Sequence, residues 1–379
     1  MKPPFRPATI AAQANGQINT ATGGTVGPIE TSTTFERDDA YRLPASGDIY
    51  RRDNNATVRE AEAVLNALEG AAETRLFGSG LAAIAAVMRA AQGPIALQDG
   101  TYYGTQKLGE AYAAEGRTVV RFPAGDLDAL RRVCAEAKPG LVVIETPSNP
   151  WLAVVDIAGT AEIAHEAGAL LAIDSTAATP ILTRPLDLGA DIVMHSATKA
   201  LNGHSDVLAG ALCVREKSET WERILSLRAM EGAVLSSFDA YLLTRGMRTL
   251  AVRVAAMNHN AAHIAHWLEA HPAVTAVRWP GLSSHPAHAL ASRQMQGGFG
   301  SLMSFDVKGG ASEALAVLSR LKLIKRATSL GGVETLIEHR HSIEPAFTNM
   351  PPALLRLSVG IEAVEDLVAD LSEGLGAIA

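Results

Sequence analysis

Residues 191–210 read DIVMHSATKALNGHSDVLAG and join a short apolar run to a polar segment. The run IVM, residues 192–194, is continuous and contains β-branched residues, which is typical of a buried strand in a parallel sheet covered on both faces. Two hydroxyls and an amine, those of Ser196, Thr198 and Lys199, follow it closely. Because ligands bind beyond the carboxyl ends of the strands in such sheets, the segment predicts an α/β fold with a polar site at the sheet edge.

The same alternation of apolar strands and helices extends to both sides of this segment. Apolar residues recur every three or four positions between Thr57 and Gly70, which predicts a helix. Further helices are expected over residues 81–92 and 160–169. The candidate strands are RLF (75–77), PIALQ (94–98), GLVVI (140–144), LLAI (170–173) and DIVM (191–194).

The chain is long enough for two domains. Residues 1–50 are polar and rich in Gly, Thr and Pro, and we expect an extended arm there. Residues 51–245 hold the alternating strands and helices and predict a large domain with a mostly parallel sheet. Residues 246–379 predict a smaller C-terminal α+β domain. Its expected elements are the end of a helical region that spans about 220–271, strands in GSLMSFDV and LLRLSVGIE, and a helix over 363–375.

Composition narrows the class of protein further. The 379 residues are 47% hydrophobic and 19% charged, as in a soluble α/β protein, and the net charge of −7 gives no electrostatic reason to expect nucleic acid or an anionic membrane as partner. Cys134 and Cys213 lie far apart and fit no metal-binding spacing. With no signal peptide, membrane anchor or disulfide framework indicated, we expect a cytoplasmic protein.

Polar loops follow five of the expected strands and should meet at one edge of the sheet. A single loop of this kind is usually a turn or a helix cap, but an amine, an anion cradle, a carboxylate and an aromatic ring together suit pyridoxal 5′-phosphate (PLP). Its aldehyde needs a lysine, its phosphate needs amides and hydroxyls, and its ring needs a carboxylate at the nitrogen. The five loops are GSG (78–80), DGTYYGT (99–105), ETPSNP (145–150), DST (174–176) and SATK (196–199).

The lysine segment HSATKALNGHSDVLAG resembles that of the Cys/Met-metabolism family of PLP enzymes, which includes cystathionine synthases and lyases, methionine lyase and homoserine sulfhydrylases. The resemblance covers almost the whole chain and implies the aminotransferase-like fold known as fold type I. Other matching segments are IYRRDNNATVREAEAVLNALEG (49–70), FGSGLAAI (77–84), ETPSNP, AIDSTAATP (172–180), SLGGVETLIEH (329–339) and LLRLSVGIE (354–362).

The resemblance implies roles for residues around the cofactor ring and the reacting bonds. Lys199 would hold the PLP aldehyde and then move protons as the general base, and burial together with cationic neighbours would lower its pKa. Asp174 would face the pyridine nitrogen, and Tyr102 would stack on the ring and contact the substrate. Ser329 would position the lysine amine. Arg356 would grip the substrate's α-carboxylate with its two-pronged guanidinium.

Other residues would hold the cofactor phosphate. Ser196 and Thr198 lie two apart, so their side chains point to one side of an extended segment. They would act together with the amides of Gly80 and Leu81. The resemblance adds a pair from a neighbouring subunit, Tyr50 and Arg52. The expected assembly is therefore a homo-oligomer with shared active sites, a dimer or a dimer of dimers.

The exact reaction stays open at this point. We lean toward a cystathionine C–S lyase, by α,β- or α,γ-elimination, with cystathionine γ-synthase or O-acyl-homoserine sulfhydrylase as the alternative, since all of these reactions use the same residues. The loop Tyr103-Gly104-Thr105 lacks the cysteine typical of methionine γ-lyases. Thr328 stands where many cystathionine γ-lyases and γ-synthases carry a glutamate, which gives less reason to expect recognition of a distal ammonium group.

Competing interpretations have less support. Tyr103 and Lys107 have the spacing used by short-chain oxidoreductases, but no glycine-rich loop follows an early strand. A PLP-binding protein without catalysis is disfavoured because no required group is missing. No metal is expected, although three histidines share one helical face, which we interpret as solvated or as a subunit contact. These are His259, His263 and His266; a further basic cluster, His339-Arg340-His341, is expected at the site's mouth or on the surface.

Overall fold

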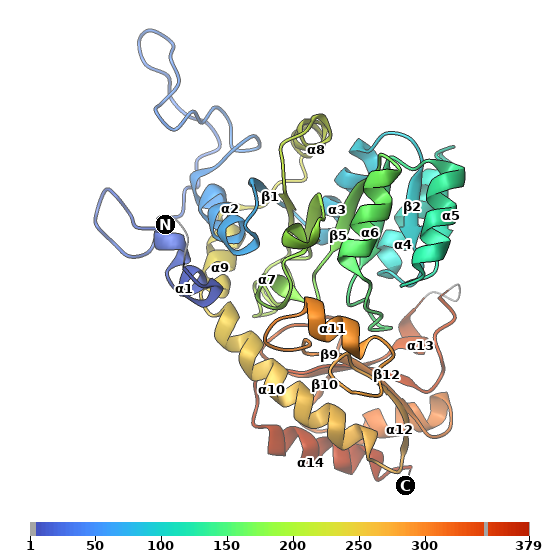
Figure 1. Ribbon diagram of the computed structural model, residues 1–379. Helices are drawn as coiled ribbons and strands as arrows, with labels where there is room; N and C mark the ends of the chain where they lie inside the picture. Colours follow the sequence, from blue (N-terminus) through green and yellow to red (C-terminus); the bar gives the residue numbers. More distant parts are fainter. Residues whose placement is uncertain (1–4, 345–347, 379) are drawn as a thin grey trace.

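The larger of two sheets forms the upper part of the molecule in Figure 1. The computed structural model describes residues 5–344 and 348–378. Seven strands lie in the order β1-β7-β6-β5-β4-β2-β3. β7 runs antiparallel to β1 and β6, and the pairs from β6 to β3 are parallel, so the mostly parallel α/β sheet is confirmed. The strands are β1 (Glu73–Phe77), β2 (Ile95–Gln98), β3 (Val119–Phe122), β4 (Leu141–Glu145), β5 (Leu170–Asp174), β6 (Ile192–His195) and β7 (Gly210–Val214).

Helices cover both faces of this sheet, as the continuous apolar strands predict. In β4, Val142 and Ile144 pack into one core cluster while Leu141 and Val143 pack into the other, because successive side chains point to opposite faces. The first cluster includes residues of α2 (Ala56–Glu69), α5 (Leu127–Ala137), α6 (Ile157–Glu166) and α9 (Ser237–Met247). The second includes residues of α3 (Gly80–Ala90), α4 (Tyr103–Ala114) and α8 (Glu219–Met230).

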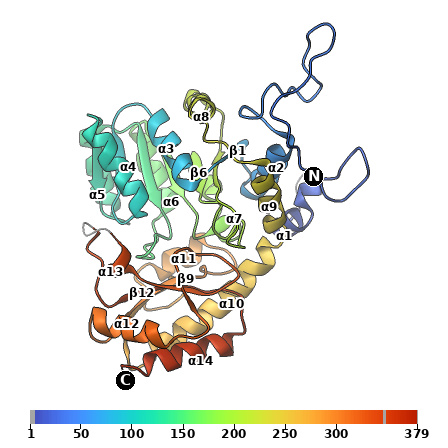
Figure 2. The same ribbon diagram turned by 180° about the vertical axis from the view of Figure 1, so that it is seen from behind.

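A five-stranded sheet, in the order β10-β11-β12-β9-β8, forms the lower part. It packs on helices that share a separate core, and the long α10 connects it to the upper part (Figure 2). The predicted boundary near residue 246 stays a prediction. The strands are β8 (Val274–Arg278), β9 (Leu302–Val307), β10 (Lys325–Arg326), β11 (Leu336–His339) and β12 (Leu354–Ser358). The helices on its core are α10 (Leu250–Glu269), α12 (Ala311–Arg320) and α14 (Val364–Leu375).

Short elements complete the fold. They are α7 (Thr179–Leu182), the 3₁₀ turn η2 (Pro185–Leu188), α11 (His288–Gln294) and α13 (Arg340–Ile343). No helix in the described ranges combines the length and the apolar character needed to cross a bilayer.

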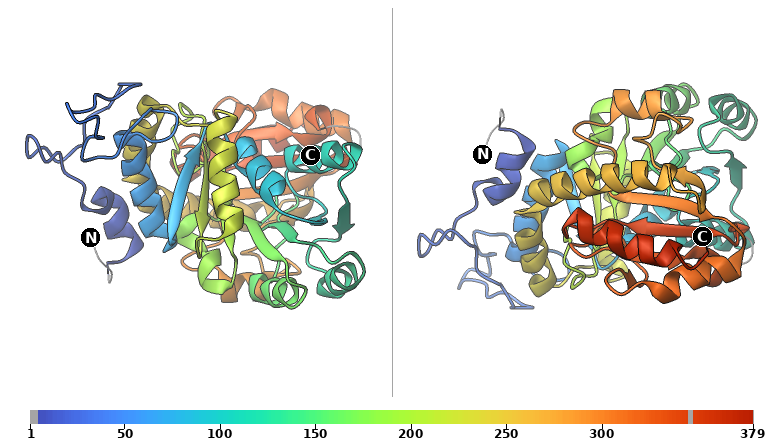
Figure 3. Two further views of the ribbon diagram at one scale, coloured as in Figure 1. Left: turned by 90° about the horizontal axis from the view of Figure 1, so that it is seen from above. Right: turned by 90° about the horizontal axis from the view of Figure 1, so that it is seen from below.

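The N-terminal region is only partly extended. The helix α1 (Pro7–Ala12) and the 3₁₀ turn η1 (Ala14–Gly16) pack against α2, because Ala11 and Ala14 are buried in the main core. The following residues have no regular structure up to α2 and project from the body as two long loops (Figures 1 and 3). The prediction of an extended arm therefore fails for residues 7–16, where a proline at the first helical position starts a helix.

Candidate active site

A cavity of about 320 Å³ lies where the carboxyl ends of β5 and β6 face the smaller sheet. Both parts of the molecule contribute to its walls, which is a common place for ligand sites. The sequence-predicted residues that line it are Gly80, Leu81, Tyr102, Asp174, Ser196, Thr198, Lys199, Ser329 and Arg356.

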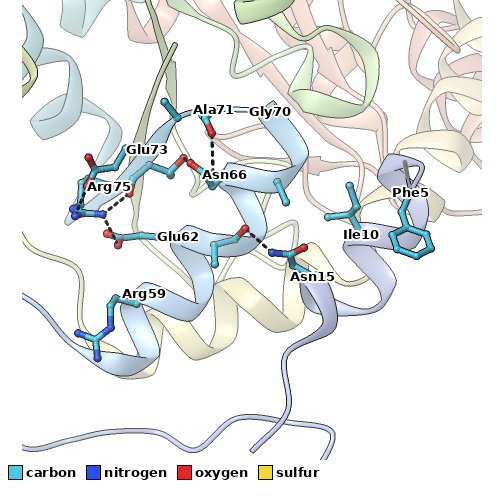
Figure 4. Close-up of a pocket in the computed structure, with 14 residues that line it drawn as sticks. Phe5, Ile10, Asn15, Arg59, Glu62, Asn66, Gly70, Ala71, Glu73 and Arg75 are labelled. Atoms are coloured by element: carbon cyan, nitrogen blue, oxygen red, sulfur yellow. Dashed lines mark hydrogen bonds and ion pairs between the residues drawn. The ribbon is translucent and has the colours of Figure 1, made fainter. Parts of the chain in front are cut away.

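A larger cavity, of about 690 Å³, lies between α1, α2 and β1 (Figure 4). None of the residues predicted for the site lines it. Two of its carboxylates, those of Glu62 and Glu73, already form ion pairs with Arg75. The smaller cavity, which holds the lysine, is therefore the candidate active site.

Lys199 follows β6, and its Nζ donates a hydrogen bond to Ser329 Oγ at 3.0 Å. Burial, helped by the positive charge of Arg356, lowers the pKa of Lys199 to about 8. A substantial share of these amines is thus neutral near physiological pH and can accept a proton. Ser329 has a φ of 121°, a backbone conformation that residues other than glycine rarely adopt and that is often found at functional sites.

The amino end of α3 forms one wall of the cavity and suits an anion. Ser79 caps this helix by accepting a hydrogen bond from the Ala82 amide at 3.1 Å. Gly80 lies so close to Ser196 that an added Cβ would come within 2.8 Å of the serine Cβ, so a side chain there would fill the cradle. The first amides of the helix, those of Gly80 and Leu81, have no partner within the helix and can bind a phosphate.

The two hydroxyls of the lysine segment are not equivalent. Thr198 Oγ1 donates to the carbonyl of Ala209 at 3.1 Å and accepts from its amide at 2.9 Å. Ser196 is held through its backbone, whose amide donates to Thr176 Oγ1 at 2.8 Å. Ser196 therefore has the freer hydroxyl for an anion, while Thr198 also fixes the segment to Ala209, the residue directly before β7.

A buried carboxylate and an aromatic ring line the middle of the cavity. Asp174 accepts hydrogen bonds from the amide and the hydroxyl of Thr176. Burial raises the pKa of Asp174, so a cationic partner would stabilise its charged form. Burial, with a hydrogen bond to Tyr103, also raises the pKa of Tyr102 to about 12, so its phenol stays neutral. These groups fit the nitrogen and the face of a pyridinium ring.

Arg356 on β12 lies at the other end of the cavity and is only 3% exposed. Its Nη2 donates to the carbonyl of Ser329 at 2.7 Å and its Nη1 donates to Asn149 Oδ1 at 3.2 Å. It also forms an ion pair with Glu338, which lies directly opposite on β11. Burial lowers the pKa of Arg356 to about 10, which leaves the guanidinium charged at neutral pH.

Several residues of the site were not identified from the sequence. Glu145 accepts hydrogen bonds from the amides of Tyr102 and Asn149 and fixes the loops after β2 and β4, and burial beside Asp174 raises its pKa well above the usual range. Glu338 and Glu344 were also missed, and the signal that could have identified them is the run of charged residues that follows the apolar segment TLI (335–337). Arg340, expected with its neighbouring histidines at the site's mouth or on the surface, lines the cavity and is buried.

Two predicted residues do not reach the cavity of their own chain. Tyr50 is 44% exposed and Arg52 lies beside its ring, 5.4 Å from Cζ to the ring centroid. Both belong to the segment between η1 and α2, which projects from the body as loops. The histidines of α10, His259, His263 and His266, are exposed on the surface; within residues 5–344 and 348–378 no three His, Cys, Asp or Glu side chains are placed to hold a metal ion.

The residues present fit PLP. The cavity offers an amine with a lowered pKa, a helix end closed by a glycine where no side chain would fit, and a buried carboxylate next to an aromatic ring. Each of these features matches one part of the cofactor: the aldehyde, the phosphate and the pyridinium ring.

Comparisons with known proteins agree with this fit. The family model described as "Cys/Met metabolism PLP-dependent enzyme" matches residues 8–376. The chain is 40% identical to cystathionine gamma-synthase of Mycobacterium tuberculosis, over 98% of this chain and 97% of that protein. It is 39% identical to cystathionine gamma-lyase of Dictyostelium discoideum, over 98% of each. The structure of cystathionine gamma-synthase from Xanthomonas oryzae pv. oryzae in complex with cystathionine superposes with a TM-score of 0.94 at 38% identity and 99% coverage of both chains.

Proposed function

This chain belongs to the Cys/Met metabolism family of PLP-dependent enzymes, and we propose that it cleaves the carbon–sulfur bond of cystathionine by elimination. That it is a PLP-dependent transsulfuration enzyme acting on sulfur amino acids follows from the family and its relatives. The observation that carries the proposal is Lys199, a partly buried amine with a pKa of about 8 in one cavity with Arg356.

Each residue of the cavity would act on one part of the substrate or the cofactor. When bound, PLP supplies an aldehyde for the substrate's amine and a ring that stabilises negative charge at Cα. The guanidinium of Arg356 would bind the α-carboxylate and so turn the Cα–H bond toward Lys199. Lys199 Nζ would take the proton from Cα, and Ser329 Oγ, 3.0 Å away, would keep the amine in place. Asp174 would balance the charge of the ring nitrogen, and Ser196 with the amides of Gly80 and Leu81 would hold the phosphate.

The carbon that carries the sulfur decides whether one or two proton transfers must precede cleavage of the carbon–sulfur bond. If the sulfur is attached at Cβ, loss of the Cα proton is sufficient for the thiolate to leave. If it is attached at Cγ, Lys199 would have to release the proton taken from Cα and then take a second one from Cβ before the thiolate leaves. In this proposal the amine of Lys199 serves both carbons.

Cystathionine γ-synthesis is the second candidate. It is favoured by the relatives and solved structures named cystathionine gamma-synthase. The same residues would perform it, with a thiol adding at Cγ after the leaving group has departed.

A substrate panel analysed by product tests the proposal. We expect cystathionine to yield pyruvate if the bond at Cβ breaks or 2-oxobutanoate if the bond at Cγ breaks, at a rate well above the buffer control. Formation of a new thioether from an acyl-homoserine and cysteine, without either oxoacid from cystathionine, would instead establish the synthase. Absence of all three products would refute both candidates.

We also propose a cytoplasmic homo-oligomer, at least a dimer, with shared active sites. The loops between α1 and α2 expose apolar side chains, including Ile18 at 56% and Tyr41 at 78%. Exposed apolar surface of this kind is typical of an interaction site. The two cysteines, Cys134 and Cys213, are free, which is compatible with a reducing compartment.

Complementation between two inactive variants tests whether the site is shared. Arg52→Ala and Lys199→Ala chains, each nearly inactive alone, should regain activity when mixed under conditions of subunit exchange. If Arg52 serves the partner's cofactor, each mixed dimer has one site that is intact at both positions, so about one site in four recovers after random mixing.

The control for this experiment is a mixture of Asp174→Ala and Lys199→Ala chains. Both positions line the cavity of one chain, so every site keeps a lesion and no activity should return. Confirmed exchange without recovery in the Arg52 mixture would show that Arg52 does not act across subunits.

A further inference from the structure

One wall of the active-site cavity carries a pair of opposite charges that the proposed mechanism does not use. Arg340 and Glu344, on and just after α13, both line the cavity and form an ion pair with each other. Arg340 also donates to Glu338 at 2.7 Å, and Glu338 in turn pairs with Arg356. The wall charges are therefore fixed relative to the guanidinium that would hold the substrate's α-carboxylate.

Both members of this pair have unused hydrogen-bonding capacity. Arg340 Nε and Glu344 Oε2 are buried, and neither has a hydrogen-bond partner among the described residues. The side chains are 4% and 3% exposed. Buried polar atoms are normally hydrogen-bonded, so this wall of the cavity keeps capacity for one further acceptor at Arg340 and one further donor at Glu344.

The space beyond Glu344 is large enough for the far end of a substrate. A second cavity, of about 380 Å³, is lined by Tyr103, Asn149 and Glu344, which also line the active-site cavity. A substrate whose α-carboxylate is held by Arg356 and whose chain points outward would thus pass Arg340 and Glu344 on its way into this second space.

We propose that Arg340 and Glu344 form a subsite for a second amino-acid group, in which Arg340 binds the distal carboxylate and Glu344 binds the distal ammonium. The inference rests on the proposed function and specifies its substrate class: thioethers with an amino acid at both ends, or cysteine as the incoming thiol if the enzyme runs as a synthase. A guanidinium and a carboxylate side by side complement a zwitterion, and neither charge would help to bind the apolar end of methionine.

This assignment also accounts for Thr328. The resemblance places a glutamate at that position in many cystathionine enzymes, and Thr328 lines the same cavity here. Glu344, which approaches from a different segment, supplies the carboxylate that Thr328 cannot. Under this proposal the enzyme recognises a distal ammonium group even though Thr328 itself gives little reason to expect it.

The test compares cystathionine with the analogue that lacks only the distal amine. This analogue is S-(2-carboxyethyl)homocysteine if the substrate panel shows cleavage at Cγ, and S-(3-carboxypropyl)cysteine if it shows cleavage at Cβ. We expect the ratio of their kcat/KM values to fall about 10- to 150-fold in Glu344→Gln, the loss expected when one hydrogen bond to a charged group is removed. In the double variant Glu344→Gln/Thr328→Glu the ratio should recover. For Arg340→Gln, cystathionine is compared with the analogue that lacks only the distal carboxylate, and that ratio should fall likewise. This analogue is S-(2-aminoethyl)homocysteine for cleavage at Cγ and S-(3-aminopropyl)cysteine for cleavage at Cβ.

Glu110→Gln is the matched control, because Glu110 is an exposed carboxylate that lines the second cavity but not the active-site cavity. Its ratio should equal that of the wild type. An equal loss on both compounds in Glu344→Gln would show that Glu344 is only structural and would overturn the proposal, as would a wild type without preference for cystathionine. If the wild type turns over neither compound, the proposed reaction is wrong; the ratio of Kd values from titration calorimetry then decides the subsite by the same criteria.

Discussion

Replacement of Lys199 by alanine is expected to lower turnover by at least about 10²–10⁴-fold, the usual contribution of a positioned general base. The amine is partly buried in the cavity wall, its pKa is lowered to about 8, and it donates a hydrogen bond to Ser329. No other lysine lines this cavity in the described residues. The alanine variant should still bind PLP, without a covalent bond, because the helix end and Asp174 are unchanged.

Borohydride reduction followed by peptide mapping identifies the lysine that carries PLP. In the wild type the label should be found on the peptide that contains Lys199, and in Lys199→Ala the absorption of lysine-bound PLP should be absent. Lys308→Ala is the control, since Lys308 is an exposed lysine in the turn after β9 and should leave both the spectrum and the turnover unchanged. A label on any other lysine would contradict the assignment.

The strands that carry the site were predictable because their physical signal is local. β4, β5 and β6 are continuous apolar runs, and both faces of each are covered by helices, as such runs predict. β7 has the same character but runs antiparallel to both neighbours, and it was not predicted. Its apolar run follows the lysine segment without a crossover helix, so its pairing depends on the tertiary fold. α4 was missed because it begins inside a Gly- and Tyr-rich stretch that resembles a turn.

The polar residues of the larger sheet were predicted for a geometrical reason. Parallel strands place their carboxyl ends at one edge, so Asp174 and Lys199 must lie near each other once β5 and β6 are adjacent. Arg356 lies on β12 of the other sheet and Ser329 lies in the loop between β10 and β11, and only the family resemblance indicated that they face the same cavity. The opposition of Glu338 and Arg356 depends on the register of β11 and β12, which strand patterns alone do not fix.

Arg356→Lys is expected to reduce kcat/KM for amino-acid substrates about 10- to 150-fold, which corresponds to about 1.5–3 kcal/mol for hydrogen bonds to a charged group. Lysine keeps the positive charge but cannot present two parallel N–H donors to a carboxylate. It would also have to replace contacts that the guanidinium makes with Ser329, Asn149 and Glu338 at once. The loss should appear in substrate binding, while the absorption spectrum of the bound cofactor stays that of the wild type.

The control for this prediction is Arg278→Lys in the same sheet. Arg278 on β8 also forms an ion pair with a carboxylate, Asp306 on β9, at 2.6 Å, but it does not line the active-site cavity. If general loss of a guanidinium in this sheet were responsible, both variants would lose melting temperature and kcat/KM alike. We expect kcat/KM to fall only in Arg356→Lys, because only there does the two-pronged donor face the bound substrate. An unchanged kcat/KM in Arg356→Lys would mean that another group holds the α-carboxylate, and Arg340 would then be the nearest candidate in the cavity wall, since it shares Glu338 with Arg356.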